Sequence, residues 1–350
     1  MEFGSDNNAG AAPAILDAVV ACSAGPALSY GDDPLTHRVR DRIRTLFDAP
    51  GAEVFLVATG TAANALAIAS FCPPWGAIYA HEGAHVEQDE CGAPEFYTAG
   101  AKIRLVSGAD GKMTPEELAA RIRATGQGDV HSVQRGMLTL TNVTEAGSVY
   151  APAEVAALAK VAKGFDLPVH LDGSRFANAL VATGATPAEM TWKAGVDVLS
   201  FGGTKNGCLG VEAVVMFDPA PAWEFELRRK RGGHLFSKHR FLAAQMDAYL
   251  EGGLWLDLAR QANDMATRLE QGLRSLPDVA HAHPRGANIQ FVTMPRRAHA
   301  RAMAAGAHYY LMPHGTPIEG DGDERLLCRL VTSWATTADE VDRFLACVRG

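Results

Sequence analysis

Residues 200–207 read Ser200-Phe201-Gly202-Gly203-Thr204-Lys205-Asn206-Gly207, at the end of an apolar run that begins at Val196. Such a short apolar run is typical of a buried strand, and three glycines around one lysine indicate a tight loop that a ligand can approach closely. A lysine in this position can form an imine with an aldehyde cofactor if its surroundings keep the amine partly deprotonated. Most lysines are simply solvated, so Lys205 alone does not identify a site.

Similar apolar runs occur on both sides of this loop and alternate with helical patterns. We predict strands at residues 53–58, 77–80, 102–106, 137–141, 168–171, 196–201 and 213–217, and helices at 62–70, 115–124, 152–163 and 187–194. This alternation is the signature of an α/β fold with a mostly parallel sheet. After residue 238 a long helical region, 240–276, precedes short strands at 288–292 and 326–332. We therefore expect a large domain over residues 1–240 and a smaller C-terminal α/β domain over residues 241–350.

Bulk composition excludes several classes of protein. The 350 residues are 47% hydrophobic and 21% charged, which is ordinary for a globular protein, and the formal charge of −8 argues against a general affinity for nucleic acid. No stretch approaches the roughly 18 apolar residues of a membrane span, and the first residues do not resemble a signal peptide. The six cysteines are scattered. We expect a cytoplasmic protein with reduced thiols, no membrane or nucleic-acid partner and no metal.

The unit before the lysine loop ends in a carboxylate. It reads Leu167-Pro168-Val169-His170-Leu171-Asp172-Gly173-Ser174-Arg175. One strand–helix–strand unit separates Asp172 from Lys205, so both side chains should reach the rim where open parallel sheets bind ligands. A carboxylate facing a pyridine nitrogen keeps that nitrogen protonated. Asp172 could equally cap the following helix.

Three other strand ends carry polar groups. Thr59, Gly60 and Thr61 open a helix after the first strand, and a helix N-terminus with free N–H groups can bind phosphate. Glu145 follows strand 137–141, where it is a general base, a substrate-orienting acceptor or a solvated loop acid. Arg329 lies within an apolar strand, where its planar fork suits a carboxylate or a structural ion pair.

The sequence His81-Glu82-Gly83-Ala84-His85 spells the H-E-x-x-H pattern of zinc proteases. In those enzymes the pattern lies within a helix, whereas here it directly follows a strand and contains a helix-weakening glycine. The zinc hydrolase is therefore the weaker hypothesis. The other hypothesis is that an imidazole, in particular that of His85, stacks on a cofactor ring. A purely structural role stays open for His81.

Taken together, these residues resemble those of the L-threonine aldolase family of fold-type I pyridoxal 5'-phosphate enzymes. The resemblance extends from Ser5 to about Arg329. The resemblance rests on Tyr30-Gly31-Asp32-Asp33-Pro34, Thr59-Gly60-Thr61-Ala62-Ala63-Asn64, His85, His170-Leu171-Asp172-Gly173-Ser174-Arg175 and the Lys205 loop. The low-specificity and phenylserine branch is indicated by Asp89-Glu90-Cys91-Gly92-Ala93-Pro94-Glu95 and by Phe201-Gly202-Gly203-Thr204-Lys205-Asn206-Gly207.

This resemblance implies an aldolase that cleaves the Cα–Cβ bond of L-β-hydroxy-α-amino acids (L-threonine, L-allo-threonine, phenylserine) reversibly to glycine and an aldehyde. Another lyase or racemase that uses the same cofactor is the alternative, because a fold does not determine a reaction. The resemblance also implies that Lys205 carries the cofactor as an imine, Asp172 pairs with the pyridinium and His85 stacks on the ring.

The remaining roles follow from the same resemblance. Gly60 and Thr61 would hold the phosphate, and Arg175 would serve both the cofactor site and, with Ser5 and Arg329, the substrate carboxylate. Tyr30 and basic residues within 228–231 would reach a neighbouring subunit's site, which implies a homodimer or homotetramer. The chain departs from many relatives in having Glu145 where they have a histidine after the Asn-Thr turn. His85, Glu145 or an ordered water therefore remain candidates for the base that acts on the β-hydroxyl.

Overall fold

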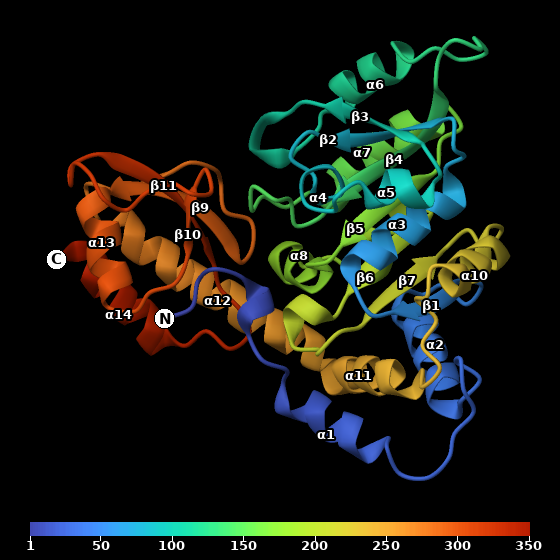
Figure 1. Ribbon diagram of the computed structural model, residues 1–350, viewed down its shortest axis with the longest axis horizontal. Coiled ribbons are helices and arrows are strands. Elements are labelled where there is room, and N and C mark those ends of the chain that lie inside the picture. The colour runs from blue at the N-terminus through green and yellow to red at the C-terminus, as the bar shows by residue number, and fades with distance from the viewer.

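A seven-stranded sheet forms the centre of the larger of two bodies in the computed structural model, which describes all 350 residues (Figure 1). Its order is β1-β7-β6-β5-β4-β2-β3, and only β7 runs antiparallel to its neighbours. The predicted mostly parallel α/β fold is thus confirmed. The strands are β1 (Glu53–Val57), β2 (Gly76–His81), β3 (Lys102–Val106), β4 (Gln134–Thr141), β5 (Val169–Gly173), β6 (Val198–Gly202) and β7 (Glu212–Met216).

Helices cover both faces of this sheet, because successive strand residues point to opposite sides. Val54 and Leu56 belong to the largest apolar core, whereas Phe55 and Val57 belong to a separate cluster on the other face. The first core packs on α1 (Pro13–Ala21), α2 (Pro34–Leu46), α6 (Pro115–Arg123), α7 (Pro152–Lys163), α8 (Phe176–Thr183), α9 (Pro187–Met190) and α11 (Arg240–Leu250). The opposite face packs on α3 (Gly60–Phe71), α4 (His85–Gln88) and α10 (Ala222–Arg231), with α5 (Ala93–Tyr97) beside them.

Two predicted helices prove to be interrupted. Thr186 caps α9 as expected, by accepting a hydrogen bond from the backbone of Glu189, but the helix stops at Met190 and a separate turn follows at Trp192–Ala194. The region predicted as one helix over 240–276 is α11 and then α12 (Leu254–Arg274). Gly252 and Gly253, with φ of 58° and 82°, separate them in a left-handed turn that L-residues rarely adopt.

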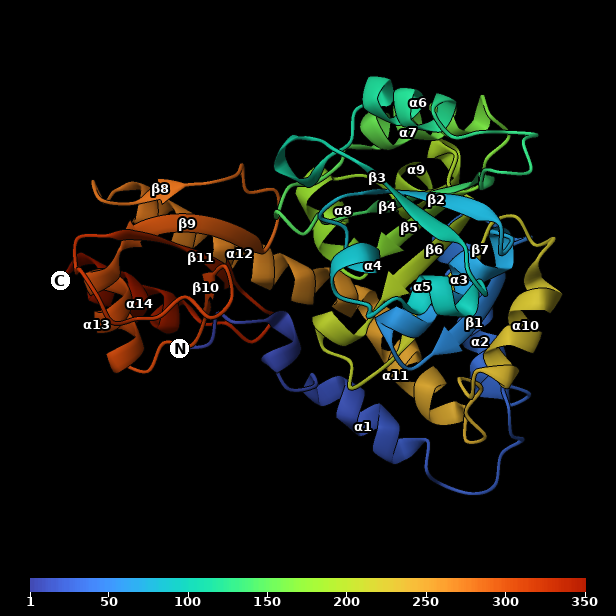
Figure 2. The same ribbon diagram turned by 45° about the horizontal axis from the view of Figure 1, so that its top comes forward.

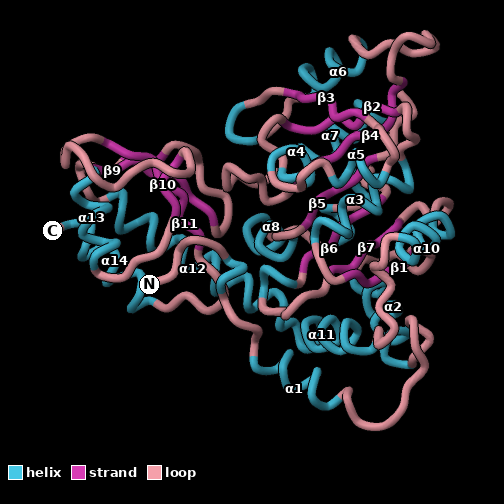
Figure 3. Tube along the Cα trace, in the orientation of Figure 1, coloured by secondary structure: helices cyan, strands magenta, loops and turns pink.

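The smaller body is built on a four-stranded antiparallel sheet with the order β10-β11-β9-β8. Figure 3 labels β9, β10 and β11 of this sheet. Its elements are β8 (Ala280–His281), β9 (Ile289–Pro295), α13 (Arg296–Ala304), β10 (Tyr310–Met312), β11 (Arg325–Val331) and α14 (Ala338–Arg349). Its core of 17 buried residues includes Phe3, so the beginning of the chain packs with the end. Residues 242–259 contribute instead to the core of the larger body. The division into domains at residue 240 stays a prediction, and the core contacts favour a boundary nearer residue 260.

Helix α12 joins the two bodies, and the N-terminal segment runs back between them toward α1 (Figure 2). The N-terminal segment is attached at both ends: Glu2 forms a bridge with His308 of the smaller body, and Ala12 N donates to the carbonyl of Gly207 at 2.8 Å. The segment therefore links the smaller body to the lysine loop. None of the helices combines the length and the apolar composition that a membrane crossing requires.

Candidate active site

The loop that carries Lys205 follows β6 at the carboxyl edge of the sheet. Strands β5 and β6 are parallel neighbours in which Asp172 pairs with Ser200, so the two strands end side by side, as the sequence predicted. Glu212 anchors the loop by accepting a hydrogen bond from Gly203 N at 2.9 Å. A Cβ at Gly202 would lie 2.2 Å from the carbonyl oxygen of Ser174, so this position requires glycine. Lys205 itself is half-buried, and its amine forms no hydrogen bond or salt bridge.

Asp172 is a buried carboxylate with several donors. It accepts hydrogen bonds from Ser174 N at 3.0 Å, from Ser174 Oγ at 2.7 Å and from Asn64 Nδ2 at 3.0 Å. Burial acts to raise the pKa of Asp172, but the positive charges of His85 and Lys205 and the hydrogen bonds from Ser174 together hold it below its usual value. Asp172 is therefore ionised at neutral pH. Its hydrogen bonds stay within its own turn and α3, and it is not the N-cap of α8.

His85 lies beside this carboxylate, at the start of α4. Its Nδ1 is 2.8 Å from Oε1 of Glu90, and the same oxygen accepts from Asn64 Nδ2 at 2.8 Å. Sequence reasoning identified His85 and Asp172 but gave no role to Glu90 or Asn64. Their positions in the sequence could have indicated such a role. Glu90 follows His85 by five residues, within the segment Asp89–Glu95, and Asn64 is the last residue of the Thr59–Asn64 motif.

Helix α3 begins next to Asp172. Thr59 is its N-cap and accepts from Ala62 N at 3.2 Å, which leaves the N–H groups of Gly60 and Thr61 without carbonyl partners inside the helix. A Cβ placed at Gly60 would lie 3.6 Å from Ser174 Oγ, so this helix start adjoins the Asp172 turn. The positive end of the helix dipole and the free N–H groups are suited to a phosphate.

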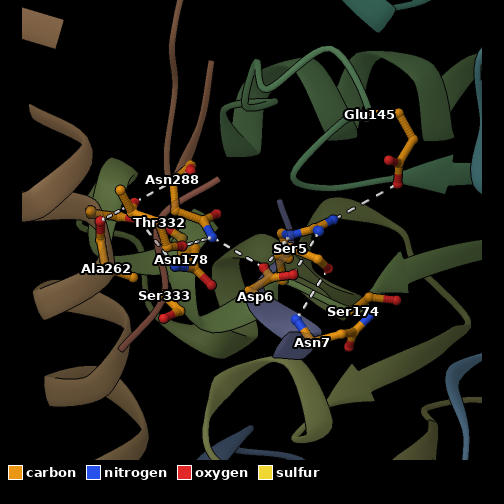
Figure 4. Close-up of polar contacts among 12 residues, drawn as sticks. Ser5, Asp6, Asn7, Glu145, Ser174, Asn178, Ala262, Asn288, Thr332 and Ser333 are labelled. Atoms are coloured by element: carbon orange, nitrogen blue, oxygen red, sulfur yellow. Dashed lines mark hydrogen bonds and ion pairs between the residues drawn. The ribbon is translucent and has the colours of Figure 1, made fainter. Parts of the chain in front are cut away.

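Arg175 is buried and already engaged. Its Nε and Nη2 donate to the two carboxylate oxygens of Asp6 at 2.6 Å and 2.9 Å, and its Nη1 lies 3.9 Å from Oε1 of Glu145. Asp6 also accepts from Asn288 Nδ2 of the smaller body at 3.1 Å, so it lies between the two bodies (Figure 4). The sequence reasoning did not single out Asp6 or Asn288. The pair with Asp6 uses Nε and Nη2, so Nη1 is the nitrogen of this guanidinium that forms no hydrogen bond.

Arg329 reaches the same N-terminal segment from the smaller body. Its Nη2 donates to the carbonyl of Gly4 at 3.2 Å, next to Ser5, whose Oγ accepts from Asn7 N at 3.2 Å. Nε of Arg329 is buried without a hydrogen-bond partner, and the guanidinium forms no salt bridge. Arg329 is therefore a cation with unused donors, which favours the carboxylate-binding hypothesis over the structural ion pair.

His81 has a structural role. It is the last residue of β2, its Nδ1 accepts from Gly83 N at 3.0 Å, and its Nε2 lies 3.0 Å from the carbonyl of Gly108. Both ring nitrogens are thus used within the protein, and His85 belongs to a different element. The two histidines do not form the single helical face that a zinc-protease motif requires.

Tyr30 lies on an exposed loop rather than at this rim. It has a left-handed φ of 61°, its N–H donates to the carbonyl of Ser237 at 2.9 Å, and Lys230 Nζ lies 4.4 Å from the centre of its ring. Within one chain, Tyr30 and the basic end of α10 therefore form a surface pair away from the residues described above.

Several known proteins are similar to this chain in sequence or in fold. A profile of the β-eliminating lyase family matches residues 2–296. The low-specificity L-threonine aldolase of Pseudomonas sp. (strain NCIMB 10558) is 40% identical over 99% of this chain and 97% of its own length. That of Pseudomonas aeruginosa is also 40% identical, over 97% of this chain and 94% of its own length. The threonine aldolase structure from Leishmania major has a TM-score of 0.91 at 26% identity, covering 99% of this chain and 98% of that one. Serine palmitoyltransferase from Sphingomonas wittichii shares the fold, with a TM-score of 0.70 at 16% identity and coverage of 100% and 86%.

Proposed function

The chain belongs to the β-eliminating lyase family, and from this we propose that it is a pyridoxal 5'-phosphate-dependent aldolase of the threonine aldolase type. It cleaves the Cα–Cβ bond of L-β-hydroxy-α-amino acids such as L-threonine, L-allo-threonine and phenylserine, reversibly, to glycine and an aldehyde. The 40% identity to two low-specificity L-threonine aldolases over nearly the whole chain supports this activity.

The donor set at the rim fits the cofactor. It offers a primary amine without a partner on Lys205, an ionised carboxylate on Asp172 and two free N–H groups at Gly60 and Thr61, which match an aldehyde, a pyridine nitrogen and a phosphate. When bound, the cofactor would supply an electron sink for the negative charge that develops on the substrate Cα. The single observation that carries the proposal is the unpaired Lys205 amine beside the buried, ionised Asp172.

The protein's own groups would then bind the substrate and move one proton. Arg329 and Ser5, together with Nη1 of Arg175, would hold the substrate carboxylate and so orient the Cα–Cβ bond. Asp172 would keep a proton on the ring nitrogen through its negative charge. His85 and Glu145 are the acid–base side chains in reach of this rim that can take the proton from the β-hydroxyl, either directly or through a water molecule.

The proposal is tested by incubating the purified protein with pyridoxal 5'-phosphate and L-threonine and then measuring the products. An aldolase yields glycine and acetaldehyde in equal amounts, and Lys205→Ala should abolish this formation. If 2-oxobutanoate and ammonia form instead, the chain is a β-eliminating enzyme on the same scaffold. If the protein neither acquires a visible absorption band with the cofactor nor turns over L-threonine, the proposal is wrong.

We also propose that the protein is a cytoplasmic homodimer or homotetramer with shared active sites. Support comes from large apolar side chains that the single chain leaves exposed, such as Phe96 at 77% and Trp223 at 73%, and from the Tyr30–Lys230 pair at the surface. The free state of all six cysteines fits a reducing compartment. Light scattering that finds a 37.1 kDa monomer at micromolar concentration would contradict the assembly.

A further inference from the structure

Glu90 is a buried acid that the proposed reaction does not use directly. Its side chain has no exposed surface, and one atom each from His85, Glu90 and Asp172 lies within 4.8 Å of the other two. Oε1 of Glu90 accepts from both His85 Nδ1 and Asn64 Nδ2, whereas Oε2 is buried without a partner. Burying a carboxylate in this way is costly unless a cation compensates for it, and its direct partner here is His85.

The amide of Asn64 joins Glu90 to Asp172. One nitrogen, Nδ2, donates to Glu90 Oε1 at 2.8 Å and to Asp172 Oδ2 at 3.0 Å, and so uses both of its hydrogens. Asn64 belongs to α3, Asp172 to β5 and Glu90 to the turn after α4. The three polar groups therefore form one network that connects the helix whose N-terminus fits a phosphate with the carboxylate that fits a pyridine nitrogen.

The backbone after Glu90 is arranged to direct its side chain inward. Cys91 and Gly92 both have left-handed conformations, with φ of 52° and 71°, and Ala93 N closes the turn on the carbonyl of Glu90 at 2.9 Å. A left-handed φ is uncommon for a residue other than glycine, and such conformations persist where the surroundings hold them and often lie at functional sites. The turn thus maintains Glu90 in its buried position against His85.

Burial raises the pKa of Glu90, and the hydrogen bonds from His85 and Asn64 act to lower it. In its ionised form this carboxylate can only accept a hydrogen bond, so the hydrogen of its contact with His85 is then on Nδ1. Titratable groups from three elements face His85: Glu90, Asp172 and Lys205. The hydrogen bond that His85 donates to Glu90 raises the pKa of His85, burial lowers it, Asp172 raises it and Lys205 lowers it, with a net rise. Glu90 is thus the partner with the largest effect on the protonation of this imidazole.

We propose that Glu90 is a positioning residue of this enzyme, which fixes the plane of the His85 ring, keeps a proton on Nδ1 and, through Asn64, ties that ring to Asp172. The inference rests on the proposed function, since it assigns His85 to the cofactor site. It predicts that Glu90 contributes to cofactor binding without contacting the cofactor. Its effect should therefore disappear when His85 is absent.

The first test measures the protonation of His85 in the cofactor-free, full-length protein. Histidine Cε1 is labelled with ¹³C, and the His85 resonance is assigned by its loss in His85→Asn. In Glu90→Gln the apparent pKa of His85 should fall relative to wild type, whereas Glu87→Gln, which removes a carboxylate from the same helix as His85, should leave it unchanged. If Glu90 had a merely structural role, the pKa of His85 would be the same in Glu90→Gln as in wild type. Such an unchanged titration would overturn the proposal.

The second test is a double-mutant cycle on the dissociation constant of pyridoxal 5'-phosphate, followed by its visible absorption. We expect Glu90→Gln to weaken binding by roughly ten- to a hundredfold, as for the loss of one charge-assisted hydrogen bond, and to have no further effect in the His85→Asn background. If the two substitutions change the dissociation constant by factors that multiply in the double variant, Glu90 acts independently of His85, and the proposal is overturned. Failure of the wild type to bind the cofactor would instead refute the proposed function, so the two failures are distinguishable.

Discussion

Asp6 and Arg175 form a two-point ion pair in which the side chains are 2% and 5% exposed and the two bodies of the protein meet (Figure 4). Burial acts to raise the pKa of Asp6, but the Arg175 guanidinium, the charge of Lys205 and the hydrogen bond from Asn288 together lower it. The pair fixes Arg175, one of the proposed substrate-binding residues, at the start of α8. Its partner Asp6 belongs to the N-terminal segment of the chain. The N-terminal segment therefore supplies one of the groups that hold the candidate site together.

From this pair we predict that Asp6→Ala reduces the free energy of unfolding by about 3–5 kcal/mol, because the Arg175 charge stays buried without its partner. Urea unfolding of the cofactor-free protein measures the change. Asp257→Ala is the matched control, since Asp257 and Arg260 form a pair that is 68% and 53% exposed and should contribute less than about 1 kcal/mol. Equal effects of the two substitutions would contradict the prediction.

The same pair predicts a pH dependence with a defined sign. The pKa of Asp6 is lowered in the folded state, so its contribution is complete above the unfolded-state value of about 3.9 and is lost as the pH falls through the folded-state value. Wild type and Asp6→Ala should therefore converge in stability at acidic pH and differ most at neutral pH. A difference between them that does not change with pH would show that the Asp6 charge is not the cause.

Lys205 is predicted to be the residue that borohydride reduction links to the cofactor. It has no partner, whereas Lys193 forms a salt bridge with Asp48 at 3.1 Å and lies outside the site. Peptide mapping of the reduced protein should find the pyridoxyl group on Lys205. A label on Lys193 or Lys238 would refute the assignment.

Asp172→Asn should keep the fold and some cofactor but lower turnover by several orders of magnitude. Asparagine preserves the shape and can still accept from Ser174, but it lacks the negative charge that holds a proton on the ring nitrogen. Steady-state kinetics with L-threonine, together with circular dichroism to confirm the fold, measures the effect. Near-normal turnover would mean that this carboxylate only supports its own turn.

The strand ends could be predicted from the sequence because apolar runs and glycine turns are local signals. The strand predicted at 102–106 and the helix predicted at 152–163 have these same bounds in the structure, and Asp172 and Lys205 meet at one rim as expected. Composition alone could not show that Gly252 and Gly253 adopt left-handed conformations within an otherwise helical pattern. The sequence therefore suggested one helix where two exist.

The partners of the site residues could not be predicted because they are distant in sequence. Asp6 contacts Arg175 across 169 positions and Asn288 across 282, and no local pattern reports such contacts. Glu90 is only five residues from His85, but its burial depends on Asn64 and on the left-handed turn at Cys91. Sequence reasoning thus located the groups that would contact a cofactor and missed those that hold them.

Arg329 is predicted to bind the substrate carboxylate. Arg329→Ala should reduce kcat/KM for L-threonine by roughly ten- to a hundredfold, which corresponds to about 1.5–3 kcal/mol for a charge-assisted contact. Arg329→Lys should recover only part of this loss, because an ammonium group cannot present the planar fork. An unchanged kcat/KM in Arg329→Ala would place the carboxylate elsewhere, for instance on Nη1 of Arg175.

The last prediction is that this enzyme prefers bulky aromatic β-substituents, such as that of phenylserine, over the methyl group of threonine. It rests on the family resemblance, which associates the segment 89–95 with the phenylserine branch and places Glu145 where many relatives have a larger imidazole. Glu145 lies near Arg175, with Oε1 3.9 Å from Nη1 (Figure 4). We expect the smaller side chain at this position to leave room for a phenyl ring once the substrate is bound.

Burial of a phenyl ring instead of a methyl group is worth about 1–2 kcal/mol, so kcat/KM for L-threo-phenylserine should exceed that for L-threonine by roughly five- to thirtyfold. Both substrates are measured on one preparation, and the Glu145→His variant, which restores the bulk, should lower the ratio. Glu145→Gln is the control of equal size: if the space and not the charge determines the preference, this variant keeps a ratio above one. A wild-type ratio below one would refute the size argument and would leave the aldolase activity itself untouched, because that activity depends on Lys205 and Asp172.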